Sequence, residues 1–192
     1  VLRGQDLNWS AFINYSANES IVTDLGLDTE EIVYSGFSNL GNVAKVGESL
    51  GAIVGSKITT TDSGGRLVNN QGSYDTTFGT NIIGDANPNF LLNISNSISY
   101  KNLSFNFLIN HVNGGDIYSM TVATMLGRGL TNDTLDRELS FILPGVNSAG
   151  EVNTKQINNS TFYFSNVLYG PDELQIYDGS VWRLGEISLT YD

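Results

Sequence analysis

The chain has 192 residues, a formal net charge of −11 and no cysteine. An acidic chain lacks the basic patches that phosphate backbones require, which argues against nucleic acid as a partner, and no disulfide framework can form. The lack of cysteine fits a cytosolic protein and equally a bacterial envelope protein. No apolar run is as long as a transmembrane helix, although strands of a membrane barrel would leave only a weak hydropathy signal.

The first predicted strand covers residues 7–17. Side chains point to alternate faces of a strand, so one face carries apolar residues and the other small polar ones, with Phe12 as the exception. Residues 18–89 then form a long stretch that we expect to be irregular. Within it we expect a short helix over residues 29–34. We expect residues 46–58 to be a buried or paired piece, or else a further barrel strand.

A β-hairpin is predicted over residues 90–100 and 103–112, joined by a two-residue turn at Lys101-Asn102 in which Asn102 takes a positive φ. This turn fixes the register of the two strands. One face then pairs apolar residues, and the other pairs serine and asparagine. The expected pairs are Tyr100 with Leu103, Ile98 with Phe105, Ile94 with Ile109, Ser99 with Ser104, Ser97 with Asn106, and Asn93 with Asn110.

The last predicted strand covers residues 182–191 and follows a second irregular stretch, residues 113–180, which holds a short turn before Arg137. Its two predicted faces carry Ile187, Leu189 and Tyr191 on one side and Leu184, Glu186, Ser188 and Thr190 on the other. The chain begins with no signal peptide and ends inside this strand. We therefore expect both ends to be cuts through a larger protein.

Two surroundings can explain the apolar faces, and strand length alone does not choose between them. Soluble strands average about five or six residues, whereas a tilted strand needs about 9 to 11 to cross a bilayer. The chain fits an all-β fold, either antiparallel strands of a large transmembrane β-barrel or a soluble, secreted β-sandwich that binds carbohydrate or mediates adhesion. Long stretches on one side and a short hairpin on the other are typical of a barrel with long extracellular loops.

Several motifs then point to one family. Residues 84–119 contain "GDANPNF", "SYKNLSF" and "GGDIYS", and this region resembles the SusC/RagA family of TonB-dependent outer-membrane transporters. Four further segments resemble family segments in the same order, and together the matches span nearly the whole chain. These are "WSAFINYSANES" (9–20), "VGESLGAIVG" (46–55), "PGVNSAGEVNT" (144–154) and "YDGSVWRLGEISLTYD" (177–192).

This resemblance implies a C-terminal barrel segment in the bacterial outer membrane, without the plug domain and without the segment that contacts the TonB complex. The implied function is import of an oligosaccharide or peptide together with a SusD-like lipoprotein, with outer-membrane lipid around the barrel. The resemblance implies no catalysis and no cofactor. Many family members carry a calcium-loop-like motif before "GDxNP". Residues 61–72 lack its carboxylates, so we predict no metal there.

Candidate contact residues are aromatic. Side chains near strand ends on the apolar face are expected at the membrane interfaces, as in an aromatic belt: Trp9, Tyr15, Tyr100 and Tyr191. Side chains in the long stretches could contact a sugar or the lipoprotein lid, or simply pack: Tyr74, Phe78, Tyr118, Tyr163 and Tyr169.

The remaining candidates for chemistry are few. His111 is the only histidine, so it can support neither a metal cluster nor a catalytic triad by itself. Asp172, Glu173 and Asp178 could suggest a glycoside hydrolase, which uses paired carboxylates. Their spacing defines no active site, and we interpret them as solvated charges.

Overall fold

A computed structural model describes residues 1–26 and 28–191. The chain is mainly antiparallel β-sheet with few helices, so the all-β prediction is confirmed. It divides into two compact units. The sheet unit contains Val1–Ser20, Ala86–Asp116 and the segment from Asp178 onward. The insert unit contains Ile21–Asp85 and Ile117–Tyr177, which are the two stretches between the long strands.

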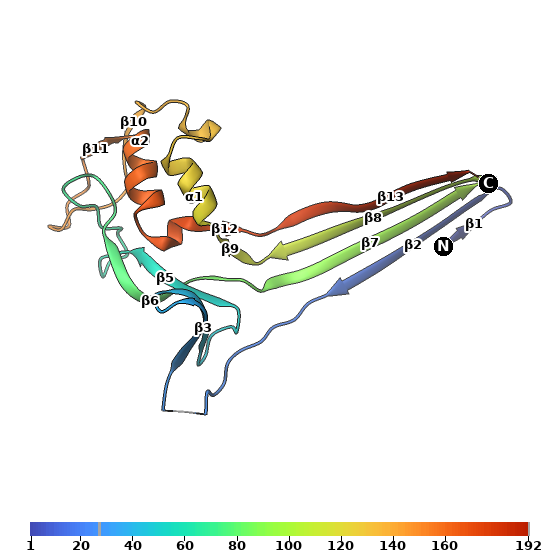
Figure 1. Cartoon of the computed structure of the whole chain (residues 1–192), viewed down its shortest axis with the longest axis horizontal. Helices are drawn as coiled ribbons and strands as arrows, with labels where there is room; N and C mark the ends of the chain where they lie inside the picture. The colour runs from blue at the N-terminus through green and yellow to red at the C-terminus, as the bar shows by residue number, and fades with distance from the viewer. Residues whose placement is uncertain (27, 192) are drawn as a thin grey trace. The chain divides into compact units, whose positions relative to one another are not determined.

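The sheet unit is one five-stranded antiparallel sheet in the order β1-β2-β7-β8-β13 (Figure 1). Its four long strands coincide with the predicted segments to within two residues at each end. Within the described residues the sheet does not close on itself, because β1 and β13 end the order. The strands are β1 (Leu2–Arg3), β2 (Leu7–Ser16), β7 (Pro88–Tyr100), β8 (Leu103–Gly114) and β13 (Val181–Tyr191).

The β7–β8 hairpin has the predicted register, and all six expected cross-strand pairs are present. The turn differs in one detail, because the positive φ, 52°, belongs to Lys101 and not to Asn102. β2 continues the pattern on the other side of β7, where Trp9 is opposite Ile98 and Ile13 is opposite Ile94. The alternation of apolar and polar faces therefore extends over neighbouring strands.

A β-bulge in β13 corrects the predicted faces of that strand. The pairing with β8 shifts between Leu184 and Glu186, so that Gly185 is the extra residue. Leu184 is therefore opposite Ile109 and shares the apolar face with Trp182, rather than the polar face with Glu186. The period-two prediction was wrong here because a bulge reverses the parity of every residue before it.

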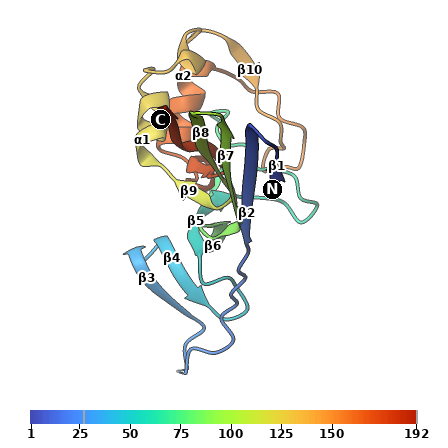
Figure 2. The same ribbon diagram turned by 90° about the vertical axis from the view of Figure 1, so that its right-hand side faces the viewer.

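The stretches predicted to be irregular are folded, and the prediction was wrong on this point. Residues 21–85 form a four-stranded sheet in the order β3-β4-β5-β6, in which β3 and β4 lie side by side as a hairpin (Figure 2). The predicted helix over residues 29–34 is absent, since this segment contributes to β3. The strands are β3 (Glu31–Phe37), β4 (Leu40–Lys45), β5 (Ala52–Ile58) and β6 (Thr76–Asp85).

Short elements make up most of the second half of the insert unit. The first helix begins after Ser119, whose side chain accepts a hydrogen bond from the Val122 N–H as an N-cap. Among the described residues, no helix is long and apolar enough to cross a membrane. The elements are β9 (Asp116–Tyr118), which pairs with β12 (Ile176–Asp178); α1 (Met120–Gly127); the 3₁₀-helix η1 (Asn132–Thr134); β10 (Ser140–Ile142), which pairs with β11 (Gln156–Asn158); α2 (Asn159–Phe162); the π-helix η2 (Tyr163–Leu168); and the 3₁₀-helix η3 (Asp172–Gln175).

The core lies in the insert unit and combines residues that are far apart in the sequence. β5 is buried on both faces and contributes to two apolar clusters. The prediction of a buried piece over residues 46–58 is thus confirmed for 52–58, whereas Val46 and Leu50 are exposed. One cluster consists of Val43, Ala52 and Val54, with Val33 and Ile82 packed against it. The other consists of Ile58, Val68, Tyr74, Leu143 and Ile157, with Phe141, Phe162 and Leu174 packed against it.

The carboxylates of η3 hold this helix against β5. Asp172 Oδ2 accepts hydrogen bonds from the Ser56 N–H at 2.9 Å and the Ser56 hydroxyl at 2.6 Å, and Glu173 Oε1 accepts from the Ile58 N–H at 2.8 Å. The β4–β5 ladder ends before these two N–H groups, so the carboxylates satisfy donors that the sheet leaves unpaired. Asp172 and Glu173 are therefore structural acceptors, and the interpretation as solvated charges was wrong for both.

A third carboxylate, Glu31, joins β3 to β4 and β6. It lies opposite Lys45 in the ladder and forms an ion pair with it at 3.3 Å. The Thr80 hydroxyl donates to Glu31 Oε1 at 2.7 Å. These contacts stabilise the charged form, and the hydrogen bond from Thr80, followed by Lys45, lowers the pKa of Glu31 below its usual 4.5.

We expect Asp172→Ala to lower the free energy of unfolding of the insert unit by about 2–4 kcal/mol, because the Ser56 donors lose a charged acceptor. Hydrogen exchange at the Ser56 and Ile58 N–H groups measures the loss. Asp178→Ala is the control. The Asp178 carboxylate is exposed and accepts from the Ser180 N–H in a turn, so its removal should destabilise the protein much less than Asp172→Ala does. Equal losses in the two variants would contradict the structural role of Asp172.

We expect the contribution of Glu31 to depend on pH. Its folded-state pKa is depressed, so its stabilisation is present above the unfolded value near 4.5 and is lost as the pH falls through the folded value. Glu31→Gln should therefore lower stability at neutral pH by less than about 1 kcal/mol, because the pair is partly exposed. This difference should vanish in acid. Unfolding curves recorded at several pH values measure this difference. The control is Glu30→Gln, which removes the same charge from an exposed neighbouring residue and should show no such dependence on pH.

Candidate functional site

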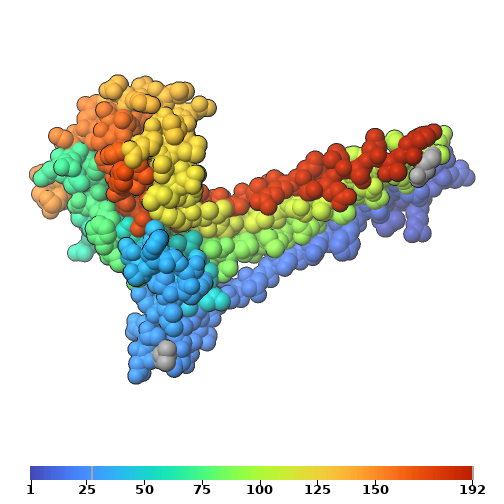
Figure 3. Space-filling model, in the orientation of Figure 1, coloured from blue at the N-terminus to red at the C-terminus, as the bar shows by residue number. Residues whose placement is uncertain are grey.

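The apolar face of the five-stranded sheet is the most extended candidate surface. Phe90, Ile94, Phe105 and Ile109 are all partly exposed, and Ile13 on β2 is 64% exposed. A β-sandwich would bury such a face under a second sheet. In the described part of the chain, no apolar side chain on this face is buried. The long strands lie next to one another at the molecular surface, coloured blue (β2), green (β7), yellow-green (β8) and red (β13) in Figure 3.

A row of aromatic rings crosses four strands at the end of this face remote from the hairpin turn. Tyr15 lies 5.3 Å from Phe90, and Phe90 lies 5.6 Å from His111, edge to face. His111 stacks on Trp182 with ring centroids 3.9 Å apart. His111 Nδ1 lies 3.1 Å from the Val181 carbonyl oxygen, which can only accept, so this nitrogen carries the proton. His111 is therefore a structural member of the row.

The opposite end of the face carries Tyr100 and Tyr191, which alternate with leucines in the row Leu7, Tyr100, Leu103, Tyr191. Between this row and the Tyr15–Trp182 row, the strands rise by about 26–33 Å at ~3.3 Å per residue. A strand tilt of about 35–45° reduces this to roughly 18–27 Å along the normal to a membrane, a range that includes the ~25 Å apolar band of outer-membrane barrels.

Asn96 is the polar exception on this face, and the structure supplies its partner. Its Oδ1 accepts a hydrogen bond from Trp9 Nε1 at 3.2 Å, and the side chain is 9% exposed. Trp9 lies two residue pairs inside the Tyr100 row, because it is opposite Ile98. The two polar groups thus satisfy each other on an otherwise apolar surface, which suits a surrounding that offers no water.

The other face of the sheet presents small polar side chains. Cross-strand neighbours there are Asn14, Asn93 and Asn110 in one row, and Ser10, Ser97, Asn106 and Ser188 in another. Asn106 Nδ2 donates to Ser188 Oγ at 3.4 Å. Phe12 interrupts this face and is 70% exposed. Arg183 continues the first row opposite Asn110, and Glu186 lies opposite Leu108, so this polar face also carries one charge of each sign.

The five loop aromatics proposed as ligand or lid contacts do not gather at one place. Tyr74 is buried in the core, with its ring beneath Arg66, whereas Phe78 is 80% exposed on β6. Tyr118 is partly buried, and its hydroxyl has no hydrogen-bond partner within the described residues. Burial, followed by the charge of Asp172, raises the pKa of Tyr118. Burial, followed by the charge of Asp133, raises the pKa of Tyr163.

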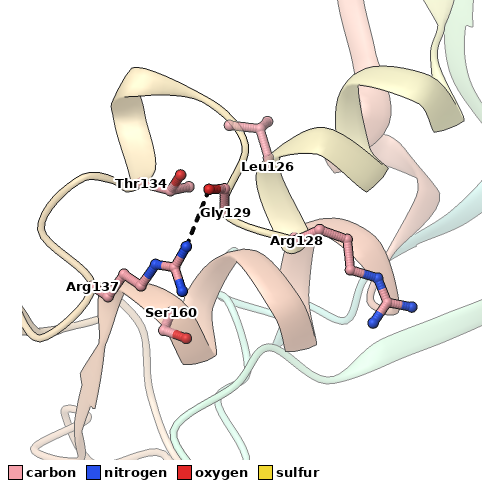
Figure 4. Close-up of a pocket in the computed structure, with 7 residues that line it drawn as sticks. Leu126, Arg128, Gly129, Thr134, Arg137 and Ser160 are labelled. Atoms are coloured by element: carbon pink, nitrogen blue, oxygen red, sulfur yellow. Dashed lines mark hydrogen bonds between the residues drawn. The ribbon is translucent and has the colours of Figure 1, made fainter.

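Tyr169 contacts one of the residues that line a hollow. The hollow has a volume of about 240 Å³ and lies at the end of α1 (Figure 4). Seven residues line it: Leu126, Gly127, Arg128, Gly129, Thr134, Arg137 and Ser160. Arg128 donates a hydrogen bond to the Tyr169 hydroxyl at 3.2 Å. Sequence reasoning missed both arginines, although two of the nine cations of an acidic chain within ten residues were an available signal.

The carboxylates do not form a catalytic pair. The carboxylates of Asp172 and Glu173 already accept hydrogen bonds from β5. Asp178 is exposed, and hydrogen bonds from the Ser180 hydroxyl and N–H lower its pKa. Leaving aside residues 27 and 192, no three His, Asp or Glu side chains come close enough together to hold a metal ion. The absence of calcium at residues 61–72 stays a prediction.

Comparison with known proteins gives one relative to report. No family model matches the chain. TonB-dependent receptor P26 of Formosa agariphila is 24% identical over 139 residues, which cover 62% of this chain and 14% of the receptor. The chain thus spans about one seventh of that relative. This distant similarity relates the chain to TonB-dependent receptors. It points to a transporter rather than to an enzyme, and it does not single out the SusC/RagA family.

We expect Trp9 and Asn96 to be energetically coupled. A double-mutant cycle with Trp9→Phe and Asn96→Ala should give a coupling of about 0.5–1.5 kcal/mol in the free energy of unfolding, the net value of one hydrogen bond. The matched cycle of Trp9→Phe with Asn93→Ala should give none, since Asn93 lies on the other face. Equal couplings in the two cycles would contradict the assigned hydrogen bond.

Proposed function

We propose that this chain forms part of the wall and the extracellular rim of an outer-membrane nutrient importer of the TonB-dependent receptor type. The sheet unit supplies the wall, with its apolar face toward lipid and its serine and asparagine face toward a hydrated lumen. The insert unit supplies the rim. The protein is located in the bacterial outer membrane under this proposal.

One observation carries the proposal. Four strands of 10, 13, 12 and 11 residues share one apolar and one small-polar face, and neither face is covered by a second sheet within the described residues. Soluble strands are commonly half this length. Aromatic rings mark both ends of the apolar face, as they do on the outer surface of membrane barrels. The similarity to TonB-dependent receptor P26 supports the same class.

The finer assignment rests on the SusC/RagA resemblance. A SusD-like lipoprotein then covers the rim and helps to capture an oligosaccharide or a peptide, and the TonB complex supplies energy through other parts of the protein. Both segments of the insert unit leave the sheet at the end opposite the Lys101-Asn102 turn. The short turn therefore faces the periplasm, and the insert unit faces the outside. The exposed aromatics Phe78 and Tyr169 are candidate contacts with substrate or lid.

Two adjacent residues test the wall. These 192 residues contain no cysteine, so Ile94→Cys and Ser95→Cys each place one thiol in this part of the protein, on opposite faces of β7. In outer membranes, we expect a water-soluble maleimide to label Ser95→Cys at least about tenfold faster than Ile94→Cys, because the apolar face meets lipid. A lipid-soluble maleimide should reduce this difference. Equal labelling by the water-soluble reagent would refute the membrane wall.

The same reagent on intact cells tests the orientation. Ala149→Cys, in an exposed turn of the insert unit, should react, whereas Asn102→Cys in the hairpin turn should react only after the outer membrane is permeabilised. The reverse pattern would place the insert unit in the periplasm and would refute its role as a rim.

A further inference from the structure

The hollow at the end of α1 is a positive site in an acidic surrounding. The insert unit carries 14 Asp and Glu residues and only six Lys and Arg, yet Arg128 and Arg137 both line this hollow. In the part of the chain that the structure describes, neither guanidinium has a carboxylate within 4.0 Å, and the ion pair present is Glu31 with Lys45. Asp136, beside Arg137 in the sequence, instead accepts from the Leu139 N–H.

Arg137 is held at the mouth of the hollow with most of its donors free. It donates one hydrogen bond, from Nη2 to the Gly129 carbonyl at 3.3 Å, and a guanidinium has five N–H donors (Figure 4). Gly129 makes room for this arrangement, because a Cβ at this position would lie 2.7 Å from the Arg137 guanidinium. In the same hollow, the Ser160 side chain makes no hydrogen bond to another described residue.

Arg128 extends away from Arg137 (Figure 4). It contacts two aromatic side chains, Phe164 and Tyr169, which form an aromatic rim beside the hollow. Its guanidinium lies 5.8 Å from the centre of the Phe164 ring and bonds the Tyr169 hydroxyl. Phe164 and Tyr169 are 43% and 64% exposed and meet edge to face at 5.0 Å. This rim therefore offers aromatic surface and a cation that is already oriented by two contacts.

We propose that the hollow and its rim bind an acidic oligosaccharide, that is, a chain of sugar rings with carboxylate or sulfate groups. The Arg137 guanidinium takes one anionic group in the hollow, since its fork of N–H donors matches the paired oxygens of either group. The Phe164 and Tyr169 rings pack against the apolar face of a neighbouring sugar ring, and Arg128 pairs with a second anionic group. This inference rests on the proposed function and names its substrate class.

Binding to the purified full-length protein in detergent tests the site by calorimetry. The probes are tetrasaccharides of equal length: an oligogalacturonate with carboxylates, a κ-carrageenan fragment with sulfates, and a neutral β-1,4-galactan. We expect at least one acidic probe to bind about tenfold or more tightly than the neutral one, and to weaken as salt is raised. The stronger acidic probe identifies the anionic group. Equal binding of the neutral probe, or binding of none, would overturn the proposal.

Charge-matched variants locate the binding. Arg137→Gln should weaken the acidic probe by about tenfold or more, and Arg137→Lys should restore it only in part because the fork is lost. Lys155→Gln removes one exposed cation from the same unit and should change affinity by less than about twofold. Equal effects of Arg137→Gln and Lys155→Gln would overturn the site. The assay needs neither transport nor a membrane, so a failed result here leaves the cysteine-labelling test of the wall to stand or fall separately.

Discussion

The register of the β7–β8 hairpin is the constraint on which the rest of the sheet depends. The two-residue turn at Lys101-Asn102 leaves one pairing for the strands, and every pair from Tyr100–Leu103 to Asn93–Asn110 follows from it. A slip of one residue would bring serines onto the apolar face along the whole strand. β2 pairs with β7 and β13 pairs with β8, and both strands continue the apolar and polar faces of the hairpin. Trp9 satisfies the polar side chain of Asn96, and the Gly185 bulge restores the parity of Trp182 and Leu184.

The sheet unit is short of hydrogen-bond partners at its edges. Among the described residues, β13 is paired with β8 alone, and the short β1 covers only the first residues of β2. Long open edges promote pairing with other strands, and hydrocarbon does not tolerate their unpaired N–H and C=O groups. Under the proposed function, further strands therefore pair with both edges.

Features that depend on neighbouring residues along one strand could be predicted from the sequence. Features that form where distant segments meet could not. The hairpin, its register and the apolar face all follow from a local period of two. The bulge does not, although Gly185 next to misplaced apolar residues was a usable signal. The insert unit was missed because its core joins residues such as Ile58 and Ile157, and because acceptors such as Asp172 find their donors more than a hundred residues away. The position of Arg137 could not be predicted either, because it depends on Gly129, which follows α1 and accepts its hydrogen bond.

Asparagine explains how the irregular segments of the insert unit stay ordered. Three nearly or fully buried side chains, Asn153, Asn159 and Asn166, serve backbone groups that no ladder pairs. Asn166 accepts from the Tyr74 N–H at 2.8 Å, and Asn159 donates to two carbonyls of the turn before Arg137. An amide can donate and accept at once without carrying charge into a core. The turn that carries Arg137 is thus anchored from beneath, so that a recognition site on irregular backbone can be held in place before any ligand arrives.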